Sequence, residues 1–209
     1  MMVAGLIVSY THGILAYRTL PLGKKTNKMI HNAAMLLAVI LVSIGLWAVF
    51  QYHNDELYAN LYTMHSWSGI VVVTLFYANY VGGFFNFFAG ATPDWMKAQY
   101  LPNHVFIGIF TYYAAAFTAV LGIQARISSA TTTAGLGDKN SALGCGYDIT
   151  LTEPDYNPAA HYWNLYSGCR LSNGLGIAII ATCLCATYAV MDVHKLKKSA
   201  EPALSAPLL

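Results

Sequence analysis

The stretch MIHNAAMLLAVILVSIGLWAVFQ, residues 29–51, decides the fold of this chain. A helix needs about 20 mostly apolar residues to cross the hydrocarbon core of a bilayer, and this stretch supplies them. Four further stretches have a similar character: Met1 to about Thr19, about Leu61 to Phe88, about Pro102 to Ala125, and about Gly174 to Met191. Strands of a membrane barrel would be about 10 residues long and alternating. The sequence therefore predicts an all-α fold, a polytopic transmembrane helical bundle with five spans.

The composition excludes several other classes of protein. Of the 209 residues, 56% are hydrophobic and only 10% are charged, whereas a soluble domain carries about 25% charged residues. A disordered chain would need low hydrophobicity and high charge. The formal net charge of +2 gives no basic signature for nucleic acid, so no nucleic-acid partner is expected. The lipid bilayer is the partner that this composition predicts.

Basic residues orient the predicted spans, because lysine and arginine accumulate on the cytosolic side. Alternate connections hold most of them: Arg18, Lys24, Lys25 and Lys28, then Lys97, then Lys195, Lys197 and Lys198. The rule places these connections and a cytoplasmic tail over residues 193–209 inside, with Met1 outside. Because Met1 begins directly inside an apolar stretch, we expect an upstream segment to precede it. No sorting motif indicates which membrane holds this single domain of residues 1–209.

The longest connection, an extended non-cytoplasmic loop over residues 127–173, is predicted to lie outside. It contains Cys145 and Cys169. On an oxidising face of the membrane these two residues could form a disulfide, and the alternative is two unpaired thiols. The sequence leaves both open.

Four histidines fall inside predicted spans, where an ionisable residue is costly and marks a functional site. His12 lies near the middle of its span, where a hydrogen-bonded core role is expected, and the other three lie near span ends. His31 and His104 each follow the cytosolic start of a span by a few residues, so their imidazoles should share one depth near the inner leaflet. Two imidazoles at one depth suit the two faces of a planar metal macrocycle, with haem as the natural candidate. His65 should lie near the outer leaflet, with no matching histidine on another span. For each of them the alternative is a hydrogen-bonded histidine in a polar core.

His53 differs from these three because it should emerge from the membrane. It follows His31 by 22 residues, which is about 33 Å along a helix. At the outer surface His53 would be available to a substrate or a metal ion, and the alternative is a solvated loop residue.

Four segments resemble the cytochrome b561 family. NLYTMHSWSG (60–69) is similar to the start of one haem helix, and LPNHVFIG (101–108) resembles the Pro-x-His-x-x-x-Gly start of another. LAYRTLPLGKKTNKMIH (15–31) resembles the Tyr-Arg, basic-loop and His segment, and MMVAGLIVSYTHGILAYR (1–18) looks like the remainder of the first haem helix. The resemblance covers roughly residues 1–126 well.

The resemblance implies six helices and two b-type haems, one toward each face, held by four central helices that each give one histidine. It implies that His31 and His104 ligate the inner haem and that His65 ligates the outer haem. The second outer ligand would align just upstream of Met1. In this chain the expected architecture is thus a four-helix haem-binding core plus a C-terminal helix.

The family moves single electrons across membranes, typically from cytosolic ascorbate to monodehydroascorbate or a ferric complex outside. For this chain the resemblance implies an ascorbate-dependent transmembrane oxidoreductase of the ferric reductase type, and it favours a homodimer. Ascorbate is an anion, which the basic cluster of Lys24, Lys25 and Lys28, with Arg18 nearby, would attract. The family positions matching His53 and Asn60 lie near the outer substrate site.

Two other functions stay open. One is a haem-free multi-span transporter or channel whose buried histidines carry protons. The other is a membrane protein that keeps the fold without transferring electrons. For the lysines, positive-inside bias is the plain alternative to a substrate role.

Overall fold

The computed structural model describes residues 2–134 and 167–190, and each element within these ranges is a helix. A π-helical segment, η1 (Ala4–Ser9), leads into α1 (Tyr10–Thr19). The remaining elements are α2 (Lys24–Asp55), α3 (Met64–Gly83), a second π-helical segment η2 (Phe84–Phe88), α4 (Asp94–Ala134) and α5 (Ser167–Val190). The prediction of an all-α fold is confirmed for these residues.

The ends of the predicted outer connection over 127–173 are helical, because α4 continues to Ala134 and α5 begins at Ser167. Its centre, with Cys145, and the predicted tail over 193–209 lie outside the described residues. The side chain of Cys169 also lies outside them.

Four of the described helices are long and apolar enough to cross a membrane: α2, α3 together with η2, α4 from Asp94 to Ala125, and α5 from Leu171 to Val190. The first predicted stretch forms a shorter apolar helix from Ala4 to Ala16. With its 32 residues, α2 is about 48 Å long, which exceeds a hydrocarbon core of about 30 Å. The basic start and the polar end of α2 therefore extend beyond that core.

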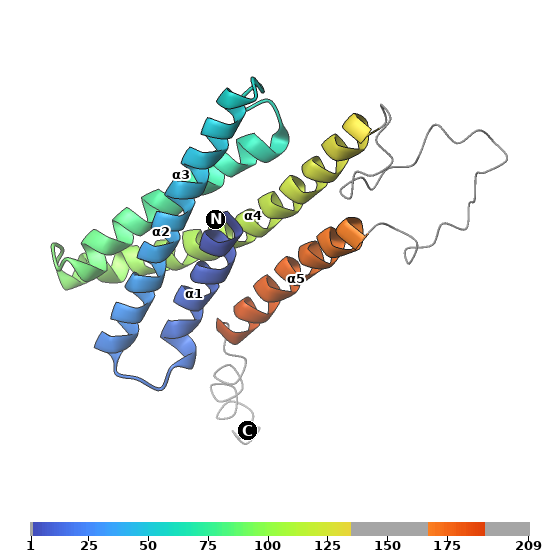
Figure 1. Ribbon diagram of the computed structural model, residues 1–209. Coiled ribbons are helices and arrows are strands. Elements are labelled where there is room, and N and C mark those ends of the chain that lie inside the picture. Colours follow the sequence, from blue (N-terminus) through green and yellow to red (C-terminus); the bar gives the residue numbers. More distant parts are fainter. Residues whose placement is uncertain (1, 135–166, 191–209) are drawn as a thin grey trace, which may run out of the picture.

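The helices are arranged as two antiparallel hairpins with one added helix. Figure 1 shows α1 beside α2, the α3–α4 pair crossing behind them, and α5 running along the other side of α1. α5 packs against both α1 and α4. Each hairpin has a short connection, which makes its two helices neighbours.

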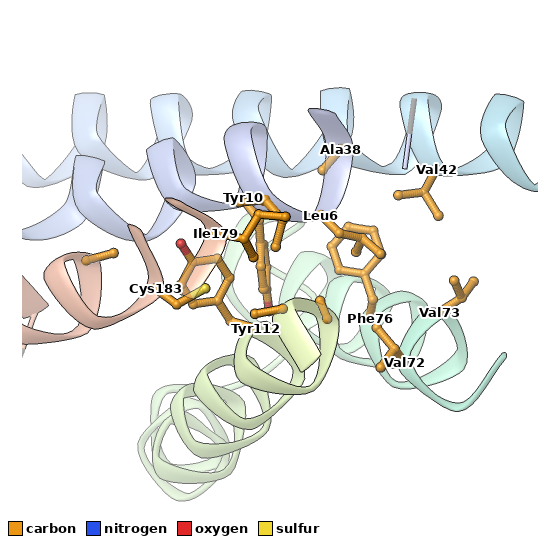
Figure 2. Packing of buried hydrophobic residues seen from close by; sticks show 14 of the residues in the cluster. Leu6, Tyr10, Ala38, Val42, Val72, Val73, Phe76, Tyr112, Ile179 and Cys183 are labelled. Atoms are coloured by element: carbon orange, nitrogen blue, oxygen red, sulfur yellow. The ribbon is translucent and has the colours of Figure 1, made fainter. Parts of the chain in front are cut away.

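The core lies where the two hairpins cross, and aromatic rings dominate it (Figure 2). Tyr10 of α1 packs edge-on against Phe76 of α3 and Tyr112 of α4, with ring centres 5.4 Å apart in both pairs. The Tyr112 hydroxyl is hydrogen-bonded to Thr11 of α1. From α5, the buried Cys183 joins this cluster. Edge-on ring pairs are the favoured geometry for aromatic side chains, so this cluster fixes how the hairpins cross.

Local backbone signals set the helix ends that carry the predicted site residues. Thr63 caps α3, since its Oγ1 accepts a hydrogen bond from the Ser66 amide at 3.2 Å, the usual arrangement at a helix start. At the end of α2, the amide of Tyr58 donates to the carbonyl of His53 at 2.8 Å. Between them Leu57 adopts a φ of 55°, which gives α2 a left-handed C-terminal stop.

Candidate functional site

His31 is held by the helix that packs against its own. Its Nδ1 donates to the backbone carbonyl of Gly13 on α1 at 2.7 Å. A carbonyl only accepts, so the bond assigns the proton to Nδ1 and the lone pair to Nε2. Gly13 lies close to α2, because a β-carbon there would be 2.5 Å from the Met35 methyl group and 3.4 Å from the β-carbon of Ala34. The close α1–α2 contact is therefore what brings the carbonyl within reach of His31.

His104 of α4 faces His31 across the bundle, as the sequence predicted for a matched depth. The two ring centres are 6.4 Å apart and the ring planes are inclined by 76°. Imidazole nitrogens bind a metal at about 2.0–2.1 Å, which holds the ring centres of two imidazoles on one metal roughly 6 Å apart. The spacing of His31 and His104 thus fits two axial ligands of one metal centre.

The His104 ring is enclosed by α3. Gly83 lies against it so closely that a β-carbon there would be 2.6 Å from Cε1 of His104. Phe87 in η2 packs edge-on against the same ring, with centres 5.4 Å apart. These contacts fix the ring by shape and leave no space for a larger residue at position 83.

His65 sits at the opposite end of the α3–α4 pair, in the first turn of α3. Its Nδ1 donates to the carbonyl of Thr118 on α4 at 2.9 Å, so its lone pair is again on Nε2. Gly122 of α4 lies against the ring, and a β-carbon there would be 2.6 Å from Cε1 of His65. A histidine that donates its other ring N–H to a carbonyl has the usual arrangement of a metal ligand.

A cavity of about 500 Å³ opens at this end of the bundle. Its walls are mostly apolar side chains of η1, α2, α3 and α4, and His53, Asn60 and His65 all line it. Pockets for small molecules and cofactors commonly have about 300–1,000 Å³ and a few converging polar groups in an apolar wall. The structure thus brings together three residues that the sequence predicted separately.

The Nδ2 of Asn60 donates to Oδ1 of Asn54 at 3.1 Å. This bond ties the α2–α3 connection to the end of α2. Asn60 itself is exposed, so it lies at the rim of the cavity rather than in its depth.

The basic cluster lies at the other end of α2, around the helix start. Lys24 and Lys25 are exposed and Lys28 is partly buried, one turn before His31 on the same helix. Arg18 lies on α1, and its side chain is outside the described residues. Lys97 at the start of α4 forms an ion pair with Asp94 at 3.0 Å.

Sequence reasoning missed the groups that hold the histidines. The acceptors for His31 and His65 are backbone carbonyls, which carry no signal in the amino-acid pattern. Gly83 and Gly122 are visible as glycines within apolar helices, where a glycine costs stability and commonly has a packing reason. Asn27 was also missed: it is buried, and its Nδ2 donates to the carbonyls of Leu20 at 3.2 Å and Leu22 at 3.3 Å.

Comparisons with known proteins show which proteins the chain is similar to. The ascorbate-specific transmembrane electron transporter 2 of Zea mays is 37% identical over 130 residues, which cover 61% of this chain and 55% of that protein. The human transmembrane ascorbate-dependent reductase is 37% identical over 125 residues, or 59% of this chain and 49% of that protein. The probable transmembrane ascorbate ferrireductase 4 of Arabidopsis thaliana is 34% identical over 169 residues, or 75% and 71%.

The chain spans about half the length of the first two of these relatives. The family model described as eukaryotic cytochrome b561 matches residues 1–129, which is more than half of the chain and includes the three histidines, the basic cluster and the rim of the cavity. The chain is therefore a multi-pass integral membrane protein that belongs to the eukaryotic cytochrome b561 family, a haem-binding family.

Proposed function

We propose that this protein carries electrons across a membrane, from ascorbate in the cytosol to monodehydroascorbate or a ferric complex on the outer side, through b-type haem. The relatives are named as ascorbate-dependent reductases, electron transporters or ferrireductases. The observation that carries the proposal is the pair of His31 and His104, whose ring centres are 6.4 Å apart.

The inner haem would be held by His31 and His104, and the outer haem by His65. When bound, haem iron would accept and release one electron at a time. The chain supplies ligands whose orientation is fixed before binding: the Gly13 carbonyl holds His31 and the Thr118 carbonyl holds His65. A hydrogen bond of this kind raises the basicity of the ligating nitrogen.

The start of α2 would bind ascorbate. Lys24 and Lys25 are exposed there, and clustered positive charge raises the local concentration of an anion. Lys28 is about 4.5 Å along the helix axis from His31, so an anion bound at this cluster would be close to the inner histidine pair. Arg18 would add to the same field.

The cavity near the outer face would hold the outer haem and lead to the acceptor. His65 lies in its wall, while His53 and Asn60 belong to the α2–α3 end of the same wall. His53 and Asn60 offer hydrogen-bonding groups to a polar acceptor at the rim. A homodimer remains an expectation from the family.

The test measures haem in protein made from the full chain. Purified protein should show a reduced-minus-oxidised spectrum of b-type haem, and its haem-to-polypeptide ratio should fall when either His31 or His104 becomes Ala. Each of these changes removes one axial ligand, so we expect loss of most of the inner haem. Vesicles loaded with ascorbate should then reduce an outside ferric chelate more slowly.

His12→Ala is the matched control. His12 is on α1, is exposed, and hydrogen-bonds the Val8 carbonyl of its own helix at 2.7 Å, so its loss should leave the haem content unchanged. A folded wild-type protein without haem would overturn the proposal, and pH-dependent flux through it would favour the transporter. Wild-type haem content in both ligand variants would also contradict it.

A further inference from the structure

The segment of α4 that carries His104 is weakened by its own sequence. Pro102 lies inside the helix, two residues before His104. A proline has no N–H, so the carbonyl four residues earlier, that of Ala98, loses its helical donor, and helices commonly bend at this point. The depth and rotation of His104 are therefore less firmly set by α4 alone than those of a residue in an uninterrupted helix.

His104 also lacks the ring hydrogen bond that fixes the other two histidines. His31 and His65 donate through Nδ1 to carbonyls of neighbouring helices. Within residues 2–134 and 167–190, no group accepts a hydrogen bond from Nδ1 of His104, although this atom is buried. Ring packing by Gly83 and Phe87 limits how the ring turns, but it does not hold the backbone from which the ring projects.

Two polar side chains from other helices bind that backbone instead. Asn79 of α3 donates through Nδ2 to the carbonyl of His104 itself at 3.3 Å. Tyr10 of α1 donates through its hydroxyl to the carbonyl of Gly108, one turn further along α4, at 3.0 Å. The two donors come from two different helices, so together they fix the His104–Gly108 turn against both hairpins.

Gly108 lies beside both donors. A β-carbon at that position would lie 3.4 Å from Nδ2 of Asn79 and 3.7 Å from the Tyr10 hydroxyl, which are ordinary contact distances. Both donors therefore pack directly against the α4 backbone at this turn. Tyr10 and Asn79 are themselves buried, at 3% and 7% exposure.

Packing alone does not account for an amide at position 79. Its Oδ1 is buried and has no hydrogen-bond partner among the described residues, and burying an unsatisfied acceptor costs free energy that an apolar side chain of the same size would avoid. An asparagine at this cost is explained if the hydrogen bond that it donates to the His104 carbonyl is what matters. That bond ends on the peptide group of a candidate haem ligand.

We propose that Asn79 and Tyr10 are positioning residues for His104, which set the depth and rotation of this ligand through its backbone. The inference rests on the proposed function in one respect, that His104 binds haem. The positioning itself is a property of the polypeptide. It can therefore be measured with and without the cofactor.

The first test uses Asn79→Leu, which keeps the volume and removes the donor. In the full-length apo-protein, the amides of the His104–Gly108 turn should exchange with solvent about tenfold faster than in the wild type, because one hydrogen bond that holds the turn is lost. In the haem-loaded protein, the inner haem should bind about tenfold more weakly and its low-spin electron paramagnetic resonance signal should shift. The outer haem signal should stay in place.

Tyr10→Phe is the gentler second variant, since it removes one hydroxyl and keeps the ring. It should change the same observables in the same direction by a smaller factor. Tyr77→Phe is its matched control, because the Tyr77 hydroxyl is hydrogen-bonded to Ser43 of α2 at 2.8 Å. This control should leave exchange at the turn and the inner haem signal unchanged.

The outcomes separate the two proposals. Wild-type exchange and wild-type inner haem signal in folded Asn79→Leu would overturn the positioning role. A wild-type protein without inner haem would defeat the proposed function, and faster exchange in Asn79→Leu would then still support positioning of the turn. If Asn79→Leu fails to fold, the result for Tyr10→Phe against Tyr77→Phe decides, since equal behaviour of these two variants rejects the inference.

Discussion

The two ends of the α3–α4 pair each contain a contact between a histidine of one helix and a glycine of the other. At the end predicted to lie outside (the outer end), His65 of α3 packs against Gly122 of α4, and at the end predicted to lie inside (the inner end), His104 of α4 packs against Gly83 of α3. In each helix the histidine and the glycine are 18 residues apart (65 to 83, and 104 to 122). Eighteen residues are five helical turns, or about 27 Å. An antiparallel pair with this spacing presents one histidine–glycine contact near each face of the membrane.

The ends differ in what completes them. At the inner end α2 adds a second imidazole, His31, whose ring centre is 6.4 Å from that of His104. At the outer end a cavity of about 500 Å³ adjoins His65, and His53 lies in its wall. At the inner end, two imidazoles are thus already placed to bind one metal between them. The outer end has room for a cofactor and polar groups at its rim.

The largest expected effect comes from filling the two glycine contacts separately. Gly83→Ala would put a β-carbon 2.6 Å from the His104 ring, and Gly122→Ala would do the same at His65. Each ring must move, and displacing a ligand in a packed core costs about 1–3 kcal/mol. We expect Gly83→Ala to lose the inner haem signal and Gly122→Ala the outer one. Absorption and electron paramagnetic resonance spectra of the two variants measure this.

Gly174→Ala on α5 is the matched control for both substitutions. Gly174 is exposed, and within the described part of the chain no atom of another residue stands in the way of a β-carbon there, while alanine is the better helix former. Its spectra should equal those of the wild type. If Gly83→Ala and Gly122→Ala affected the same haem, the two ends would not be independent sites, and the comparison drawn between them would be wrong.

A smaller effect should distinguish the ascorbate side of the protein from the acceptor side. Changing Lys24 and Lys28 to Gln removes two positive charges from the start of α2, which should raise the KM for ascorbate about tenfold at low ionic strength. At high salt the difference should shrink, because exposed charges are screened. The KM for the outer acceptor should not change. Steady-state kinetics with vesicles of defined orientation measure both constants.

Lys97→Gln serves as the control for charge alone. Lys97 is paired with Asp94, whose carboxylate is also within electrostatic reach of Lys24, so its removal changes the charge near the same face while every residue at the start of α2 is kept. An equal rise in the KM for ascorbate in this variant would show that the general field, and not the Lys24–Lys28 cluster, attracts the substrate.

The sequence was sufficient to predict most of the helices and the shared level of His31 and His104 in the bundle. Apolar stretches of span length locate α2, α3 and α5, and the few residues between each span start and its histidine place His31 beside His104. The start of α4 was harder to see, because residues 94–101 mix polar and apolar side chains, yet the helix begins at Asp94 and includes Pro102. Hydropathy detects only the part of a helix that lies inside lipid. Backbone hydrogen bonding continues the helix into the polar residues on either side.

The partners of the histidines could not be predicted from one sequence. A carbonyl such as that of Gly13 or Thr118 is present at every position, and only the packing of two helices selects which one meets a ring. Asn79 is conspicuous as an amide within an apolar helix, but the pattern gives no indication that it reaches the His104 backbone on another helix. These contacts depend on tertiary geometry, which periodicity within one helix does not encode.

The smallest expected effect concerns the two turns that flank α2, one before the helix and one after it. The inner turn before α2 is held by the buried Asn27, which donates to the Leu20 and Leu22 carbonyls. The outer turn after α2 depends on Leu57, which has a φ of 55° and is 91% exposed. A left-handed conformation costs a residue with a β-carbon about 1–2 kcal/mol. The outer turn is therefore strained where the inner turn is hydrogen-bonded.

Leu57→Gly should relieve this strain. Glycine adopts positive φ without penalty but loses about 0.5–1 kcal/mol more entropy on folding, so the net gain should be at most about 1 kcal/mol, seen as a small rise in Tm. Leu61→Gly is the informative contrast, because Leu61 has a φ of 56° but lines the cavity. There the lost apolar contacts should cancel the gain. A clear fall in Tm for Leu57→Gly would mean that its exposed side chain is itself bound, by lipid or by another chain, and that the outer turn is a contact surface rather than a strained stop.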